Sequence, residues 1–165
     1  MWPVHWVRLL LELGGCIRRR QGAFRLTRKG RSLLDGPPAQ LFALLFETNF
    51  RRFDLAYRFG AEWPELQIQV PFTLYRIWSL PAEWRTAPVL LRETVLQIPP
   101  PPEAASLAHL PALLFDSRIM KPLVDFGLIA TRTEPRSRED HCLLRVSYRR
   151  TSLMRAFLHF EPSRL

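Results

Sequence analysis

The sequence has few cysteines and no long apolar run, and each shortage excludes a class of protein. Its two cysteines, Cys16 and Cys142, match no CxxC spacing and cannot form a disulfide framework, so we expect both to be small buried side chains. The apolar first stretch, residues 2–13, is interrupted by polar residues and is shorter than the roughly 20 residues of a membrane span. It also lacks the charged start of a signal peptide, so we expect a cytoplasmic protein with no membrane partner.

What the sequence does have is positive charge, carried almost entirely by arginine. The chain of 165 residues has 24 Lys and Arg against 15 Asp and Glu, a formal net charge of +9, and its only lysines are Lys29 and Lys121. Arginine is the side chain best suited to forked contacts with phosphate or carboxylate. This charge permits a nucleic-acid partner but does not require one, because an excess of arginine can also follow the base composition of a genome. With 47% hydrophobic residues, the chain is long enough for one domain or two small units.

The first apolar stretch has the pattern of a helix. Residues 2–13 carry one narrow polar stripe on an otherwise apolar surface, formed by His5, Arg8 and Glu12. Gly14 and Gly15 follow, and glycine readily adopts the left-handed conformation that ends a helix. We therefore predict a helix over residues 2–13, most of it buried.

A hairpin and a second helix are expected next. Residues 16–26 contain a single turn signal, Gln21 and Gly22, between two short extended arms, which predicts a β-hairpin. Thr27 follows as the expected N-cap of a short helix that stops at Asp35.

Beyond residue 36 the pattern is helical and rich in aromatic residues. Apolar side chains recur at spacings of three and four after Pro38, namely at Leu41, Phe42, Leu45, Phe46 and Phe50. We further predict a helix from Pro71, another helix over residues 83–96 and a stiff linker over residues 99–102. The expected organisation is a first unit over residues 1–36, a helical connecting segment over residues 37–80 and a second unit over residues 81–165.

Part of the first unit recurs near the end of the chain. Residues 25–34 align without a gap with residues 145–154, and residues 10–14 align with residues 123–127. The second copy then holds seven extra residues, which fall at the tip of its hairpin, over residues 134–140. Its three preceding helices are expected over residues 83–96, 104–110 and 117–126. Chance similarity between segments rich in arginine and leucine is the alternative interpretation.

The repeated unit has a recognisable order of motifs. A helix ending in Leu-x-x-Leu-Gly, a basic hairpin and Leu-Thr-x-x-Gly-x-x-Leu-Leu lie over residues 10–34, and more loosely over residues 123–158. This order resembles the close of a winged-helix domain of the kind found in MarR-like and PadR-like bacterial regulators. The resemblance implies a mainly α fold with two small β-hairpins, arranged as two winged-helix-like units joined by a helical segment. It also implies that the helix before the hairpin reads DNA, that the hairpin is a wing touching the DNA backbone or minor groove, and that the final helix helps dimerisation.

The two expected wings differ in charge. Residues 17–31 hold seven basic and no acidic side chains, whereas the second hairpin mixes both signs. The helix over residues 2–13 has one arginine, which Glu12 neutralises at i+4, so it is a poor reader of bases. In the second copy, Ser117, Arg118 and Lys121 are expected to face outward. The candidate nucleic-acid-binding residues are therefore Arg18, Arg19, Arg20, Arg25, Arg28, Lys29, Arg118, Lys121, Arg132, Arg136 and Arg138.

No arrangement of residues indicates catalysis or a cofactor. Residues 139–142 place Glu, Asp, His and Cys side by side, but neighbouring strand residues point to opposite faces and no second cluster completes a metal site. Signatures of nucleotide-binding loops, hydrolases and metalloproteases are absent. We therefore expect a non-enzymatic protein that holds neither a metal nor a cofactor.

Two functions follow from these observations. One is a DNA-binding or transcription-regulatory module whose basic first wing contacts the phosphates of double-stranded DNA. The other is a protein-interaction or homodimerisation module of winged-helix fold without DNA binding, in which the arginines only solvate a hairpin and protect its edge strand from pairing with other chains. The basic first wing favours the first function, and the apolar helix over residues 2–13 favours the second.

Overall fold

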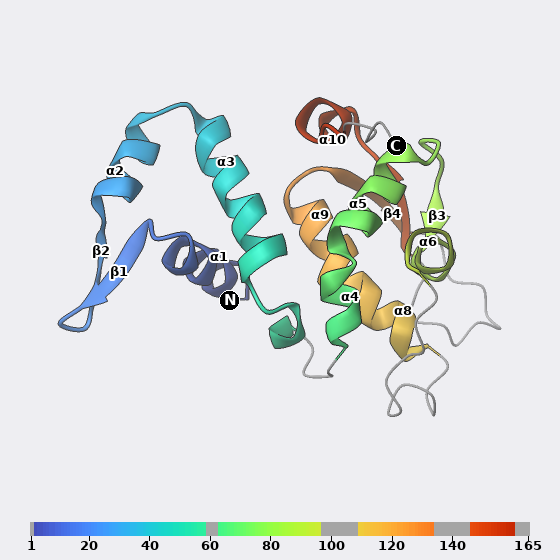
Figure 1. Cartoon of the computed structure of the whole chain (residues 1–165), viewed down its shortest axis with the longest axis horizontal. Coiled ribbons are helices and arrows are strands. Elements are labelled where there is room, and N and C mark those ends of the chain that lie inside the picture. Colours follow the sequence, from blue (N-terminus) through green and yellow to red (C-terminus); the bar gives the residue numbers. More distant parts are fainter. Residues whose placement is uncertain (1, 59–62, 97–108, 134–145, 161–165) are drawn as a thin grey trace, which may run out of the picture. The chain divides into compact units, whose positions relative to one another are not determined.

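The computed structural model describes residues 2–58, 63–96, 109–133 and 146–160. The chain forms two compact units, Met1–Leu55 and Ala56–Leu165, and Figure 1 shows the elements of each. Helices predominate, and the described strands form a two-stranded hairpin and a three-stranded antiparallel sheet. The expected division into residues 1–36, 37–80 and 81–165 differs from this one, because the middle segment is shared between the two units.

The first unit has the elements that local signals predicted. It consists of helix α1 (Trp2–Leu13), strands β1 (Ile17–Arg20) and β2 (Ala23–Leu26), helix α2 (Arg28–Asp35), helix α3 (Pro38–Glu47) and a π-helical continuation, η1 (Thr48–Arg52). Gly15 ends α1 with a φ of +74°, and the N–H of Cys16 donates to the carbonyl of Leu11 at 2.8 Å. This is the bond pattern of a glycine-terminated helix.

The turn of the first hairpin is also determined by the residues at the turn itself. Gln21 and Gly22 both have positive φ, +50° and +80°. Two positive φ values define the type I′ turn, whose twist matches that of the flanking strands. Thr27 then caps α2, because its hydroxyl accepts the N–H of Gly30 at 3.0 Å. The predicted hairpin and N-cap are therefore confirmed.

The aromatic-rich segment packs against α1 within the first unit. Trp6 and Leu10 of α1 are buried, and the indole Nε1 of Trp6 donates to Oδ1 of Asn49 at 3.2 Å. The prediction that most of α1 is buried is wrong, since Val4 is 77% and Val7 is 40% exposed. The core covers only one side of this helix, so an apolar side remains uncovered.

The second unit is built around a helix that lies against a small sheet. After a 3₁₀ turn, η2 (Leu55–Arg58), the chain forms α4 (Pro64–Ile68), α5 (Val70–Ser79), β3 (Arg85–Thr86), α6 (Ala87–Thr94), a continuous helix of α8 (Leu110–Phe115), the π-helical turn η3 (Asp116–Met120) and α9 (Lys121–Asp125), then β4 (Ile129–Thr133), β5 (Val146–Arg150) and α10 (Ser152–Phe157). The helix predicted from Pro71 is confirmed, since α5 begins one residue earlier. The sheet has the order β3-β5-β4, and all its pairs are antiparallel.

Two of the helices expected before the second hairpin differ from the observed ones. The start of the helix predicted over residues 83–96 is wrong, because Arg85 and Thr86 form β3 and pair with Tyr148 and Ser147 of β5. The helix predicted over residues 117–126 is the second half of a helix that begins at Leu110. The helix predicted over residues 104–110 and the stiff linker over residues 99–102 lie almost wholly outside the described residues.

The same junction between a helix, a hairpin and the helix that follows occurs in both units. In the first, the Thr27 hydroxyl donates to the carbonyl of Gly15 at 2.7 Å and the Thr27 N–H donates to that of Cys16 at 3.0 Å. In the second, the Thr151 hydroxyl donates to the carbonyl of Gly127 and its N–H to that of Leu128, both at 3.0 Å. The internal repeat is therefore present in the backbone.

The register of the repeat differs from the one that the sequence predicts. The sequence alignment placed Thr27 over Ser147, which lies within β5, whereas the structural counterpart of Thr27 is Thr151, four residues later. Likewise, Gly15 and not Gly14 corresponds to Gly127, since both Gly15 and Gly127 have positive φ. Arginine- and leucine-rich segments match in several registers, and only the hydrogen bonds select one of them.

Candidate nucleic-acid interface

One face of the first hairpin carries three arginines. The register of β1 and β2 pairs Arg18 with Arg25 and Arg20 with Ala23. Side chains alternate along a strand and cross-strand partners share a face, so Arg18, Arg20 and Arg25 lie on the same side of the hairpin. All three are exposed. The hairpin therefore presents a compact cationic face, which we call the arginine face.

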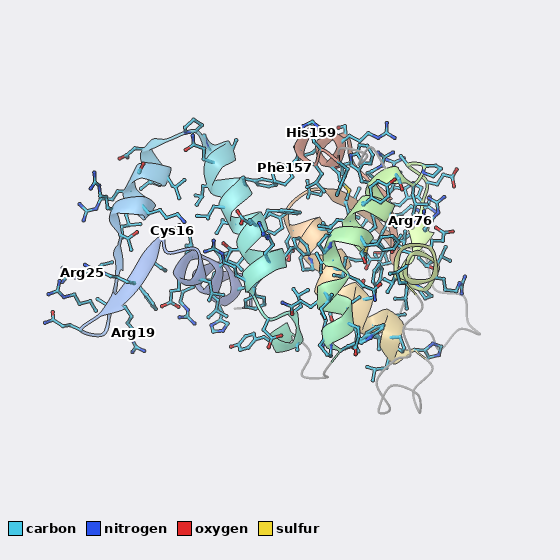
Figure 2. The ribbon with its side chains drawn as sticks, in the orientation of Figure 1. Cys16, Arg19, Arg25, Arg76, Phe157 and His159 are labelled. Atoms are coloured by element: carbon cyan, nitrogen blue, oxygen red, sulfur yellow. The ribbon has the colours of Figure 1, made fainter. Side chains whose placement is uncertain are left out.

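The opposite face of the hairpin is mostly apolar. It consists of Ile17, Arg19, Phe24 and Leu26. The guanidinium of Arg8, from α1, lies 5.4 Å from the centre of the Phe24 ring, so this face is turned toward α1. Figure 2 shows the side chains of Arg19 and Arg25 leaving the hairpin on different sides. The arginine face therefore points away from the rest of its unit.

The arginine face has no internal counter-charge. Within the part of the chain that the structure describes, none of its three guanidinium groups forms an ion pair or hydrogen bond. Like charges placed directly opposite on two strands destabilise a hairpin, and here Arg18 faces Arg25 with Arg20 beside them. An anionic ligand would relieve this repulsion, which makes the face a candidate for binding phosphate groups.

The other two candidate basic residues of the first unit, Arg28 and Lys29, differ in their contacts. Arg28 is exposed on α2, as expected for a surface contact. Lys29 instead donates from Nζ to the carbonyl of Gly14 at 2.8 Å, at the C-terminal end of α1. A cation at that position stabilises the negative end of the helix dipole, so Lys29 helps hold α2 against α1.

Two residues expected to form a base-reading surface are buried. Arg118 is 1% exposed and Ser117 is 9% exposed, so the prediction that they face outward is wrong. Their helix contacts α6 on one side and the sheet on another, where the Tyr148 hydroxyl donates to Oδ1 of Asp116. The residue types of this helix suggested an exposed side, but which side is exposed depends on the elements that pack around the helix.

Lys121 is the exposed cation of this helix. Its Nζ lies 3.5 Å from Oδ2 of the buried Asp116. A surface lysine so placed partly neutralises the carboxylate, and its own charge is then less available to a ligand. Together with the burial of Arg118, this leaves the helix without a row of donors for base edges.

The second hairpin brings two arginines onto one tryptophan. Arg132 of β4 and Arg149 of β5 lie with their guanidinium carbons 5.1 Å and 4.5 Å from the centre of the Trp84 ring. Arg132 was expected at this interface. Trp84 was missed because residue 84 was assigned to a helix, and Arg149 was not singled out although it lies in the repeated segment. Arg136 and Arg138 lie outside the described residues, so the structure does not place them.

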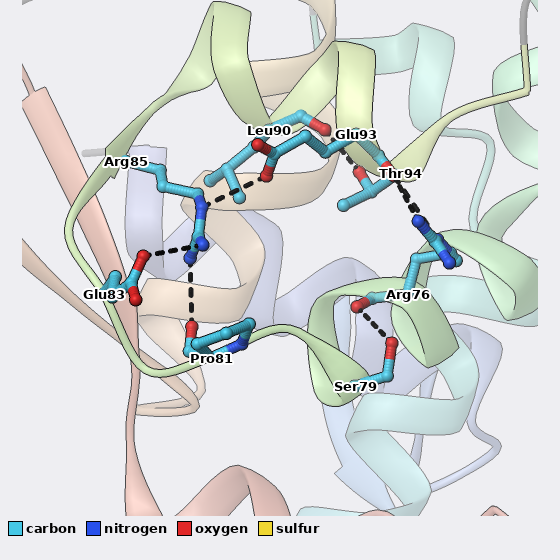
Figure 3. Close-up of polar contacts among 8 residues, drawn as sticks. All are labelled: Arg76, Ser79, Pro81, Glu83, Arg85, Leu90, Glu93 and Thr94. Carbon is cyan, nitrogen blue, oxygen red and sulfur yellow. Dashed lines mark hydrogen bonds and ion pairs between the residues drawn. The ribbon is translucent and has the colours of Figure 1, made fainter.

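Other arginines of the second unit hold the fold together. Arg85 contacts Glu83 at 2.9 Å and Glu93 at 3.1 Å, and it donates to the carbonyl of Pro81 at 3.0 Å (Figure 3). Arg76 donates twice to the carbonyl of Glu93, at 3.2 Å and 3.3 Å. These contacts join α5 and β3 to α6. Both guanidinium groups are therefore bound within the second unit.

The described residues contain no group of three or more metal-ligating side chains. Residues 139–142, whose Glu, Asp, His and Cys we considered as a metal cluster, lie outside the described residues. None of the helices in the described ranges is long and apolar enough to cross a membrane. Comparison with protein-family models, with curated proteins and with solved structures gives no match to this chain.

Proposed function

We propose that this protein is a non-enzymatic module that binds double-stranded DNA by contacting the phosphates of the DNA backbone. The observation that carries the proposal is the arginine face, where Arg18, Arg20 and Arg25 gather on one side of a hairpin with no acidic partner among the described residues. Guanidinium groups form forked hydrogen bonds to phosphate, and such contacts supply most of the sequence-independent affinity for DNA.

The order of elements supports a winged-helix interpretation of the second unit. Helix α5, strand β3, helix α6, the helix from Leu110 to Asp125 and the hairpin of β4 and β5 follow one another, and β3 pairs with β5. A winged-helix domain has this succession of a helix, a short strand, two helices and a wing. We infer that both units are winged-helix-like and that α1, the first hairpin and α2 correspond to the closing part of such a domain, with the arginine face on its wing.

The buried helix argues against reading of base sequence. A recognition helix needs exposed Arg, Lys, Asn, Gln or Ser side chains to reach base edges, and here Arg118 and Ser117 are buried. We therefore expect binding that depends on phosphates and only weakly on sequence, as suits an architectural or accessory role in transcription regulation.

A titration of the full chain with a short random duplex, followed by fluorescence anisotropy over a salt series, tests the proposal. Each neutralised phosphate contributes a slope of about −0.9 in a plot of log K against log salt. Changing both Arg18 and Arg25 to Gln is expected to reduce the slope by about two such contributions. The matched control changes Arg52 and Arg92, two exposed arginines elsewhere, to Gln and leaves the slope nearly unchanged. Equal effects of the two pairs, or no salt-dependent binding by the wild type, would refute the proposal.

A second candidate, a protein-interaction or homodimerisation module, is favoured by a different observation. Val4 and Val7 of α1 are exposed, and so are Phe24 and Leu26 on the apolar face of the hairpin, at 47% and 43%. Exposed apolar side chains that lie close together mark protein contacts. Light scattering tests the dimer: a concentration-dependent dimer that Val4→Glu dissociates supports it, and a monomer at all concentrations contradicts it.

A further inference from the structure

We propose that Trp84, Arg149 and Arg132 form a second phosphate-binding site, in the second unit, for the backbone of double-stranded DNA; this inference rests on the proposed function. The notable feature is one aromatic ring that supports two exposed guanidinium groups. We call these three residues the tryptophan site.

The sheet brings the three residues together. Arg149 of β5 is paired with Ala130 of β4, and Arg132 is paired with Ser147, so the two arginines are diagonal neighbours on one face. Trp84 directly precedes β3, whose Arg85 pairs with Tyr148. This pairing brings Trp84 beside Arg149, with its ring within reach of both arginines.

Stacking leaves the hydrogen-bonding edge of an arginine available. A guanidinium group contacts an aromatic ring through its flat surface, while its N–H donors lie in the plane of the group and point outward. The ring also restricts the side chain before a ligand arrives, so less conformational entropy is lost on binding. An arginine held in this way is suited to forked contact with a phosphate.

The charges around the tryptophan site favour an anion. Arg149 makes no ion pair or hydrogen bond with any residue that the structure describes. The nearby carboxylates of Glu83 and Glu93 are both bound by Arg85, at 2.9 Å and 3.1 Å. Arg76 and Arg85 differ from Arg149, because their guanidinium groups are bound by carbonyl or carboxylate groups within the unit.

If the contact between the arginines and the Trp84 ring has only a structural role, a different result is expected. If Trp84 and the arginines only fasten the hairpin to β3, removing the guanidinium of Arg149 changes the stability of the unit and not the salt dependence of binding. Arg149→Lys separates charge from shape, since lysine keeps the charge but lacks the planar fork. The two roles are therefore distinguishable by measurement.

The experiment is the same anisotropy titration of the full chain with a short random duplex over a salt series. Arg149→Gln is expected to reduce the negative slope by about one phosphate contribution, so that affinity changes about threefold less between roughly 50 and 200 mM salt. Arg149→Lys is expected to keep most of the slope but to bind more weakly at every salt concentration. Arg92→Gln, on the exposed side of α6, is the matched control with an unchanged slope.

Trp84→Leu tests the support that the ring provides. It is expected to weaken binding about threefold with the arginines still present, because the guanidinium groups are no longer held in place. Thermal unfolding by circular dichroism identifies a variant that fails to fold, and Arg149→Gln, at an exposed position, then remains the deciding variant.

The outcomes separate this inference from the proposed function. If the double change of Arg18 and Arg25 reduces the slope while Arg149→Gln behaves like Arg92→Gln, the tryptophan site is refuted and the arginine face stands. If the wild type shows no salt-dependent binding, both fail. A loss of slope in Arg149→Gln, with unfolding unchanged, supports the site.

Discussion

Arg18 and Arg25 are direct cross-strand partners in the first hairpin, so two cationic side chains lie next to each other on one exposed face. A pair of like charges at this distance costs stability, whereas an opposite pair contributes about 0.2 to 1 kcal/mol. The arrangement is therefore unfavourable for the isolated protein and favourable for a complex with a polyanion. Replacing one of these arginines would therefore increase the stability of the folded protein.

The first prediction concerns this opposition between stability and binding. Arg18→Glu converts a repulsive pair into an attractive one, and we expect the free energy of unfolding of the first unit to rise by about 0.5 kcal/mol at low salt. Urea unfolding followed by circular dichroism measures this change. The gain is expected to shrink at high salt, because exposed charges are screened.

The same variant, Arg18→Glu, is expected to lose affinity for DNA.

Arg18→Gln is the control for the stability measurement. It removes the repulsion without adding an attraction, so about half of the increase in the free energy of unfolding is expected. A less stable Arg18→Glu variant would show that the arginine face is not the source of repulsion that the register indicates.

The second prediction concerns the threonine that joins hairpin and helix. Thr27→Ala removes the bond from the Gly30 N–H, 3.0 Å, and the bond to the Gly15 carbonyl, 2.7 Å. Loss of an N-cap costs about 1 to 2 kcal/mol, so urea unfolding is expected to show a decrease of that size. Thr27→Ser keeps the hydroxyl and is expected to restore most of the stability.

The corresponding threonine of the second unit allows a comparison. Thr151 donates to the carbonyl of Gly127 at 3.0 Å, but its side chain accepts no N–H from α10. Thr151→Ala is therefore expected to cost less than Thr27→Ala. An equal or larger cost would mean that the hydrogen bond to the preceding glycine, and not the cap, carries the stability.

The third prediction concerns the contact between α2 and the residue that precedes the first hairpin, where Gly30 lies against Cys16. A Cβ atom added at Gly30 would overlap the carbonyl oxygen of Cys16, and this backbone cannot turn aside as a flexible side chain can. Gly30→Ala is expected to destabilise the first unit by about 2 to 3 kcal/mol. Ser32→Ala, at an exposed position of α2, is the control, with an expected effect within about 0.5 kcal/mol. A Gly30→Ala variant as stable as the control would contradict the packing described.

The fourth prediction concerns pH and the buried phenol. Burial, together with the hydrogen bond to Asp116, raises the pKa of the Tyr148 phenol above its ordinary value of about 10. Because the folded state holds the proton more tightly than the unfolded state, the stabilisation is complete below about pH 10 and is lost as the pH rises beyond it. Phenolate absorbance is expected to show Tyr148 ionising only when the second unit unfolds.

Tyr148→Phe separates the hydroxyl from the ring. It leaves the buried carboxylate of Asp116 without its phenol donor, and we expect a cost of about 1 to 3 kcal/mol at neutral pH. The alkaline loss of stability should be smaller in this variant. An unchanged alkaline transition would assign it to another group.

The elements of the first unit were predictable because each depends on signals a few residues apart. The Gly15 cap, the turn at Gln21 and Gly22, and the Thr27 cap each involve a backbone conformation or a hydrogen bond that the neighbouring residues specify. The basic character of residues 17–31 was also visible in the sequence. That three of these arginines share one face followed once the hairpin register was known.

The tryptophan site was not predictable in the same way. Strand β3 is two residues long, too short to show an alternating pattern, and it exists because it pairs with β5, more than sixty residues later. Without that strand, Trp84 had no assigned partner. The signal that was available was Arg149, which lies in the repeated segment but was not singled out.

The sequence by itself determined the local pieces of this protein, namely helix α1 and its glycine end, the first hairpin, the capped helix α2 and the excess of arginine. Only the tertiary structure decided which arginines meet solvent. Arg18 and Arg25 are exposed, Arg118 is buried, Arg85 is bound by two glutamates, and Arg149 lies on Trp84. The reason is physical: a backbone turn depends on adjacent residues, whereas the exposure and pairing of a charge depend on every element that packs around it.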